Sequence, residues 1–103
     1  MGESMDEKVK RFARKIRKAF DVQKIVLFGS RARGDWLHTS DYDFLIVSKD
    51  FEGLNFLNRP ANVLNKTKEY FATDLLCYTP EEFARKKKQI GIVSQAVKEG
   101  INL

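Results

Sequence analysis

Two aspartates spaced two residues apart are the strongest chemical feature of this 103-residue sequence. Asp41 and Asp43 lead into the apolar run of residues 44–47, which is typical of a buried strand. Residues two apart on a strand point to the same face, about 6.6 Å from each other. Like charges so close raise each other's proton affinity, and a divalent cation held by carboxylate oxygens would compensate them. The alternative is an exposed strand entry in which Asp41 caps a turn.

Asp74 is a third carboxylate, and it lies within residues 71–78, a mostly apolar run that also predicts a strand. A carboxylate among apolar residues is costly to bury without a partner. If this strand lies beside the strand of Asp41 and Asp43, the three acids can hold two Mg²⁺ ions. Two-metal sites serve in-line transfer at phosphorus, because they stabilise both the attacking and the leaving oxygen. The alternative is an edge-strand aspartate that faces water.

A glycine-serine turn precedes the aspartates, in the stretch Phe28-Gly29-Ser30-Arg31-Ala32-Arg33-Gly34. The turn leaves an expected strand at residues 24–28 and opens a short helix that Ser30 can cap. Backbone N–H groups at a helix N-terminus, together with a serine hydroxyl, bind phosphate oxygens. Gly29 would let the backbone come close to such a ligand. By itself, the turn predicts no more than an N-cap.

Helices and strands are expected to alternate around these residues. The three-and-four spacing of apolar residues within 9–20 predicts an amphipathic helix with a Lys and Arg face. Arg59-Pro60 is typical of a helix start, and Thr79-Pro80 followed by Glu82 predicts a capping box. A last helix from Ile92 is expected to end at Gly100. With strands at 24–28, 42–47 and 71–78, the sequence predicts an α/β fold, a small mixed β-sheet with helices packed against it.

Composition restricts the class of protein. Hydrophobic residues make up 43% of the chain and charged residues 32%, as in ordinary globular domains. No apolar run approaches the roughly 18 residues that would span a bilayer. We expect one domain over residues 1–103 and, because the sequence shows no secretory signal, a cytoplasmic location. Cys77, the single cysteine, is expected in the core.

The net charge of +5 is unevenly distributed. Residues 1–20 carry +4 and residues 81–88 carry +2, whereas residues 21–80 carry −1. A basic shell around a locally acidic centre suits a site that holds cations and receives a polyanion. The alternative is that the basic residues are simply solvated faces of helices.

The glycine-serine turn, the Asp41/Asp43 pair and Asp74, in this order and spacing, resemble the minimal nucleotidyltransferase (MNT) domains of the DNA polymerase beta superfamily. The resemblance extends over nearly the whole chain. It implies a nucleotidyltransferase that moves a nucleoside monophosphate from an NTP to an acceptor hydroxyl and releases pyrophosphate. It also implies that Gly29 and Ser30 bind the triphosphate, and that Arg33 sits near the phosphates or braces the acidic cluster.

The same resemblance implies that Asp41, Asp43 and Asp74 ligate two Mg²⁺ ions, and that Asp74 also helps to activate the acceptor hydroxyl. The motif departs from the usual family pattern at Tyr42, Phe44 and Thr73. None of these departures removes an expected ligand.

Small domains of this kind are similar to the antitoxin half of HEPN–MNT toxin–antitoxin pairs, in which some members transfer AMP to a tyrosine of the HEPN protein. The resemblance implies ATP as the substrate and a HEPN-type protein as the partner. Two other functions fit the sequence. One is a non-catalytic module that neutralises its partner by direct binding, and the other is a nucleic-acid binder that uses the basic faces of residues 8–18 and 85–88.

Overall fold

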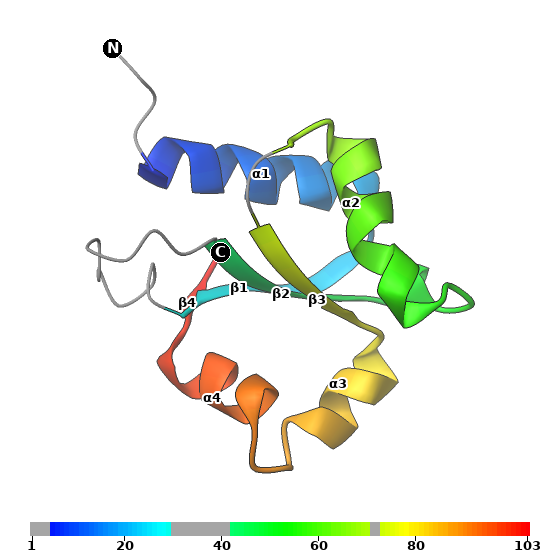
Figure 1. Ribbon diagram of the computed structural model, residues 1–103, viewed down its shortest axis with the longest axis vertical. Helices are drawn as coiled ribbons and strands as arrows, with labels where there is room; N and C mark the ends of the chain where they lie inside the picture. Colours follow the sequence, from blue (N-terminus) through cyan, green and yellow to red (C-terminus); the bar gives the residue numbers. More distant parts are fainter. Residues whose placement is uncertain (1–4, 30–41, 71–72) are drawn as a thin grey trace.

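A four-stranded mixed sheet organises the chain in the computed structural model, which describes residues 5–29, 42–70 and 73–103 (Figure 1). The strand order is β3-β2-β1-β4. Strands β2 and β3 are parallel, whereas β1 pairs antiparallel with β2 and with β4. The strands are β1 (Val22–Phe28), β2 (Tyr42–Ser48), β3 (Thr73–Tyr78) and β4 (Ile101–Asn102). The predicted α/β fold with a small mixed sheet is confirmed.

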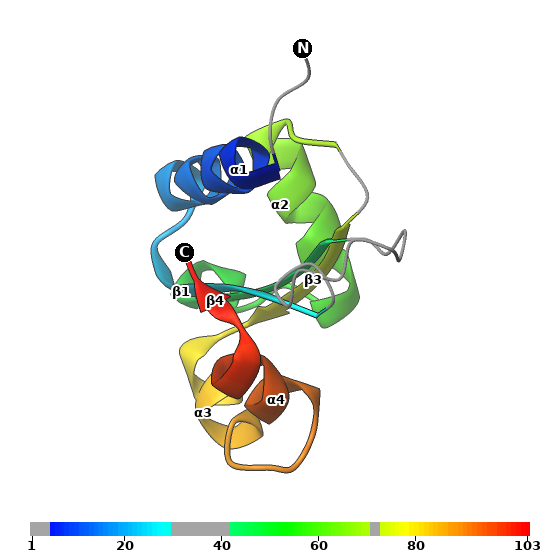
Figure 2. The ribbon, with the colours of Figure 1, turned by 90° about the vertical axis from the view of Figure 1, so that its left-hand side faces the viewer.

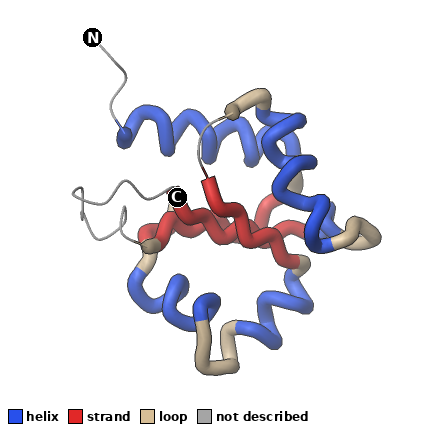
Figure 3. The backbone as a smooth tube through the Cα atoms, in the orientation of Figure 1, coloured by secondary structure: helices blue, strands red, loops and turns tan. Residues whose placement is uncertain are grey.

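Helices cover both faces of this sheet (Figures 2 and 3). Helices α1 (Met5–Ala19) and α2 (Arg59–Thr67) cover what we call the first face. Helices α3 (Pro80–Lys86) and α4 (Ile92–Glu99) cover the second face. Two short 3₁₀ turns, Lys49–Phe51 and Phe56–Asn58, connect β2 to α2. Among the helices of the described ranges, none combines the length and the apolar character needed to cross a membrane.

The core of the first face is aromatic. The ring of Phe12 meets that of Phe44 edge-on, with centroids 5.1 Å apart, and Phe20 packs against Phe51 at 5.4 Å. The alternation of the strand residues explains this core, because every second side chain of a strand points to the same face. The buried residues of this face are Val9, Phe12, Ala13, Ile16, Phe20, Ile25, Leu27, Phe44, Ile46, Phe51, Val63, Leu75 and Cys77.

The second face has a smaller core, to which α3 and α4 contribute few residues. Thr79 begins α3 with the predicted capping box: its hydroxyl accepts from Glu82 N at 3.2 Å, and Glu82 Oε1 accepts from Thr79 N at 2.8 Å. The buried residues of this face are Val26, Phe28, Leu45, Val47, Tyr78, Phe83, Val93 and Ala96. The second core therefore depends on two helices of seven and eight residues.

Gly100 ends α4 as predicted, although it does so in extended backbone rather than in the left-handed region. A Cβ at Gly100 would overlap the side chain of Val26 and the backbone of α4 and β1. Glycine is therefore required there by close packing of α4 on β1. The next two residues form β4, which the sequence did not predict because a two-residue strand leaves no periodic pattern.

Candidate active site

Asp43 and Asp74 lie side by side at the end of the sheet where β2 and β3 begin. They are direct partners in the parallel register of the two strands, and Asp43 is also the antiparallel partner of Phe28 in β1. Neighbouring strands lie about 4.8 Å apart, and paired residues project from the same face. That face is the second one, because Leu45 and Leu76, two residues further along each strand, pack in its core. The strand of Asp74 thus lies beside that of Asp43, which is the condition under which the sequence allowed the acids to share metal ions.

Gly29 brings the end of β1 against the carboxylate of Asp43. Its φ of +82° lies in the left-handed region, where residues with a Cβ are strained. A Cβ built at Gly29 would overlap Oδ2 of Asp43. The turn that is expected to bind a triphosphate therefore starts within contact distance of Asp43, one of the two paired acids Asp43 and Asp74.

The two carboxylates differ in burial. Asp43 is half-buried, whereas Asp74 is exposed near the start of the edge strand β3. The expectation that burial makes Asp74 costly without a partner is therefore wrong, because β3 has an open edge that water can reach. What links Asp74 to the site is its register with Asp43.

Several expected site residues lie outside the described ranges. These are Ser30, Arg33 and Asp41, together with the short helix expected after Ser30. Within the part of the chain that the structure describes, no group of three His, Cys, Asp or Glu side chains could hold a metal ion. Asp43 and Asp74 supply the carboxylate oxygens that Mg²⁺ prefers, so their chemistry fits a divalent cation.

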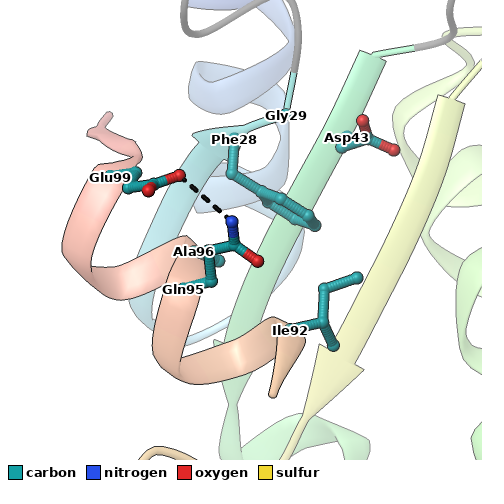
Figure 4. A pocket seen from close by; sticks show the side chains of 7 residues that line it. All are labelled: Phe28, Gly29, Asp43, Ile92, Gln95, Ala96 and Glu99. Atoms are coloured by element: carbon teal, nitrogen blue, oxygen red, sulfur yellow. Dashed lines mark hydrogen bonds between the residues drawn. The ribbon is translucent and has the colours of Figure 1, made fainter. Parts of the chain in front are cut away.

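A pocket of about 240 Å³ adjoins Asp43 on the second face, between the end of β1 and helix α4 (Figure 4). Its polar residues on α4, Gln95 and Glu99, were not predicted as site residues. They stand four positions apart on one helix face, and this spacing was the signal available in the sequence. The lining residues are Phe28, Gly29, Asp43, Ile92, Gln95, Ala96 and Glu99.

The largest pKa shifts among the described groups lie away from this pocket. Hydrogen bonds from Arg11 and Lys15 lower the pKa of Glu69 to about 2. A hydrogen bond from Arg59 lowers the pKa of Glu82, and burial raises the pKa of the Cys77 thiol to about 12. The predicted core position of Cys77 is confirmed, since its side chain is fully buried. These shifts reflect structural ion pairs and burial rather than a reactive group.

Comparison with known proteins gives one family and two kinds of fold neighbour. The model of the nucleotidyltransferase domain family matches residues 8–100. The crystal structure of a "putative nucleotidyltransferase" from Sulfolobus solfataricus superposes with a TM-score of 0.65 at 26% identity, covering 99% of this chain and 89% of that one. No curated protein matches the chain.

A second kind of neighbour shares most of the same fold. BolA1 from Arabidopsis thaliana superposes with a TM-score of 0.58 at 26% identity, over 73% of this chain and 94% of that one. The BolA domain of SufE1 from the same plant gives a TM-score of 0.57 at 16% identity, over 79% and 99%. Because two different kinds of protein share this architecture, the residues at the site must decide the activity.

Proposed function

Because the chain belongs to the nucleotidyltransferase domain family, we propose that it transfers AMP from ATP to a hydroxyl of a HEPN-type partner protein, in an Mg²⁺-dependent reaction. In this proposal the protein is the antitoxin of a toxin–antitoxin pair. The observation that carries the proposal is the position of Asp43, between Asp74 in β3 and Gly29 at the end of β1. A triphosphate bound at the turn would reach the acid pair directly.

Each residue then has a distinct task. Asp43 and Asp74 would hold Mg²⁺, together with Asp41, which stands two residues before Asp43. With Mg²⁺ held there, these residues would supply stabilisation of the negative charge on the attacking oxygen and on the leaving phosphate oxygens. Gly29 and Ser30 bind the triphosphate through backbone N–H groups and a hydroxyl, and Arg33 lies near the phosphates.

The transfer conserves atoms and charge. The acceptor oxygen attacks the α-phosphorus, a new O–P bond forms, and the bond between the α-phosphorus and the bridging oxygen breaks to release pyrophosphate. Asp74 helps to remove the acceptor's proton. Because β3 is an edge strand and Asp74 is exposed, a hydroxyl carried by another protein can approach from that side.

The test is label transfer from ATP labelled at the α-phosphate, with Mg²⁺ and the protein encoded beside this chain as acceptor. The expected result is labelling of the neighbour protein that falls by about 100-fold or more in Asp43→Asn. The matched control is Asp21→Asn, which removes an exposed carboxylate that pairs with the surface residue Lys49 at 3.0 Å. The control should transfer label at the wild-type rate.

The alternative of a non-catalytic antitoxin predicts a different pattern. A module that works by direct binding should still neutralise its partner when Asp43 is replaced by Asn. Equal label transfer by wild type and Asp43→Asn, or none by either, would overturn the catalytic proposal. Growth rescue by Asp43→Asn without label transfer would favour direct binding.

A further inference from the structure

The pocket beside Asp43 lies on one side of the acid pair only. It opens between Gly29 of β1 and helix α4, whereas Asp74 belongs to β3, on the opposite side of β2. Apolar side chains of Phe28, Ile92 and Ala96 form part of its wall. An NTP whose phosphates bind at the Gly29 turn can therefore extend into this pocket, while the acceptor approaches past Asp74.

The α4 end of the pocket is a poor site for phosphate, whereas Gly29 and Asp43 at its other end belong to the phosphate and metal site of the proposed function. Its lining contains two carboxylates, Asp43 and Glu99, and its described lining includes neither Lys nor Arg. Its volume of about 240 Å³ is below the roughly 300–1,000 Å³ of sites for drug-sized ligands. A neutral, planar ring system fits these properties better than a whole nucleotide.

Glu99 fixes which way the amide of Gln95 points. Gln95 Nε2 donates to Glu99 Oε2 at 3.4 Å, and an ionised carboxylate can only accept. The amide must therefore turn its nitrogen toward Glu99 and its carbonyl oxygen away from it, as Figure 4 shows. The pocket thus receives a hydrogen-bond acceptor from Gln95.

Helix α4 holds this pair in a fixed position. Ala96, between the two residues, is buried against the sheet. Gly100, directly after Glu99, packs so closely on Val26 that a Cβ would overlap its side chain. The amide and carboxylate are therefore presented by a helix whose backbone is anchored between them, at Ala96, and directly after them, at Gly100.

We propose that this pocket holds the base of the NTP, and that Gln95, oriented by Glu99, selects bases with an amino group at the edge that it faces. Adenine N6 and cytosine N4 donate hydrogen bonds, whereas guanine O6 and uracil O4 only accept. A base that places a carbonyl oxygen opposite the amide oxygen of Gln95 would leave both oxygens without a hydrogen-bond donor, which lowers the affinity. This inference rests on the proposed function, because it takes the ligand to be a nucleotide.

The test is direct binding, without transfer, of α,β-methylene-ATP and α,β-methylene-GTP in the presence of Mg²⁺, measured by calorimetry. Wild type should bind the ATP analogue about tenfold more tightly than the GTP analogue. Glu99→Gln should bring this ratio close to one, since an amide at that position both donates and accepts and Gln95 can then reverse. Gln95→Ala should also lose the preference.

Glu81→Gln is the matched control, because it removes an exposed carboxylate from α3 outside the pocket lining. This variant should keep the wild-type ratio. Since Gln95 and Glu99 are both exposed, their variants should fold, and circular dichroism checks this. Photolabelling by 8-azido-ATP gives a second readout: the labelled peptide should include α4.

The outcomes separate this inference from the proposed function. Base-selective binding without label transfer to the partner protein would keep the inference and overturn the transfer reaction. Equal binding of the two analogues by wild type, or an unchanged ratio in Glu99→Gln, would overturn the inference alone. If the Gln95 and Glu99 variants change only the KM for the acceptor protein, the pocket receives the acceptor and the inference is wrong. Binding of neither analogue would overturn both.

Discussion

The two faces of the sheet are built for different tasks. On the first face, the 15-residue helix α1 and helix α2 cover fully buried rings such as Phe12 and Phe44. On the second face, the helices α3 and α4 are shorter, and their core residues do not cover the ends at which β2 and β3 begin. Asp43 and the pocket lie at those ends. Most of the stabilising burial is therefore separated from the chemical groups by the thickness of one sheet.

Arg59 joins the two layers at the edge of the sheet. Its buried guanidinium donates to the carbonyl of Cys77 in β3 at 3.0 Å and to Glu82 in α3 at 2.6 Å. The residue itself starts α2 on the first face. Helices on opposite faces are therefore connected through one side chain, whose charge is paired and hydrogen-bonded as burial requires.

The largest expected effect comes from removing the central ring of the first face. Phe44→Ala deletes a fully buried side chain that packs on Phe12, and it should lower the free energy of unfolding by about 3–5 kcal/mol. Ile92→Ala, on the second face, removes a side chain that is 56% exposed and should cost less than about 1 kcal/mol.

Urea unfolding of both variants measures this difference, and nucleotide binding completes the comparison. Ile92→Ala should weaken nucleotide binding although it hardly changes stability, because Ile92 lines the pocket. Similar losses of stability in the two variants would contradict the separation of the faces.

Two glycines offer a matched test of the second face. Gly29 and Gly53 have nearly the same φ, +82° and +81°, so Ala should cost about 1–2 kcal/mol of stability at either position. Only at Gly29 would the new Cβ overlap Asp43, since among the described residues no atom beyond the two chain neighbours lies within 4 Å of a Cβ at Gly53. Gly29→Ala should therefore reduce label transfer by tenfold or more, whereas Gly53→Ala should transfer at the wild-type rate.

Thermal unfolding and label-transfer rates of the two glycine variants check this prediction. Equal transfer rates would show that the contact between the turn and Asp43 has no part in the reaction.

The smallest effect concerns pH and the first face. Arg11 and Lys15 lower the pKa of Glu69 from 4.5 to about 2. The carboxylate of Glu69 therefore binds a proton less readily in the folded protein than in the unfolded chain. The resulting stabilisation is complete above pH 4.5 and is lost as the pH falls toward 2. Screening by water around the partly exposed Arg11 and Lys15 limits it to about 1 kcal/mol.

Glu69→Gln should therefore be less stable than wild type at pH 7, and the difference should shrink to near zero at pH 2. Denaturant titrations at several pH values measure it. A difference that stays constant across this range would mean that the charge of Glu69 is not what stabilises the contact.

Local signals in the sequence predicted the elements well. The capping box of Thr79 and Glu82 is confirmed because both of its hydrogen bonds join residues three apart. The strands around Val26 and Leu45 are confirmed because apolar runs of this length between turn signals favour buried strands. The family resemblance is confirmed by the match over residues 8–100.

Features that depend on distant residues could not be predicted in this way. The register that pairs Asp43 with Asp74 is set by packing across the sheet rather than by local pattern. The buried position of Arg59 depends on partners 18 and 23 residues away. Gln95 and Glu99 line the pocket beside Asp43 because Gly100 and β4 place α4 against β1. The roles of Ser30, Arg33 and Asp41 stay predictions.

The buried thiol of Cys77 can be used to measure opening of the structure around β3. A thiol reagent cannot reach this side chain in the folded protein, so its rate of modification measures how often the first-face core around β3 opens, by movement of the strand or of the helices that cover it. Asp74 belongs to the same strand. A ligand that bridges Asp74 and Asp43 should slow the part of this modification that requires β3 to separate from β2, by up to the factor 1 + [L]/Kd. The protein's one cysteine can therefore detect binding at these two acids.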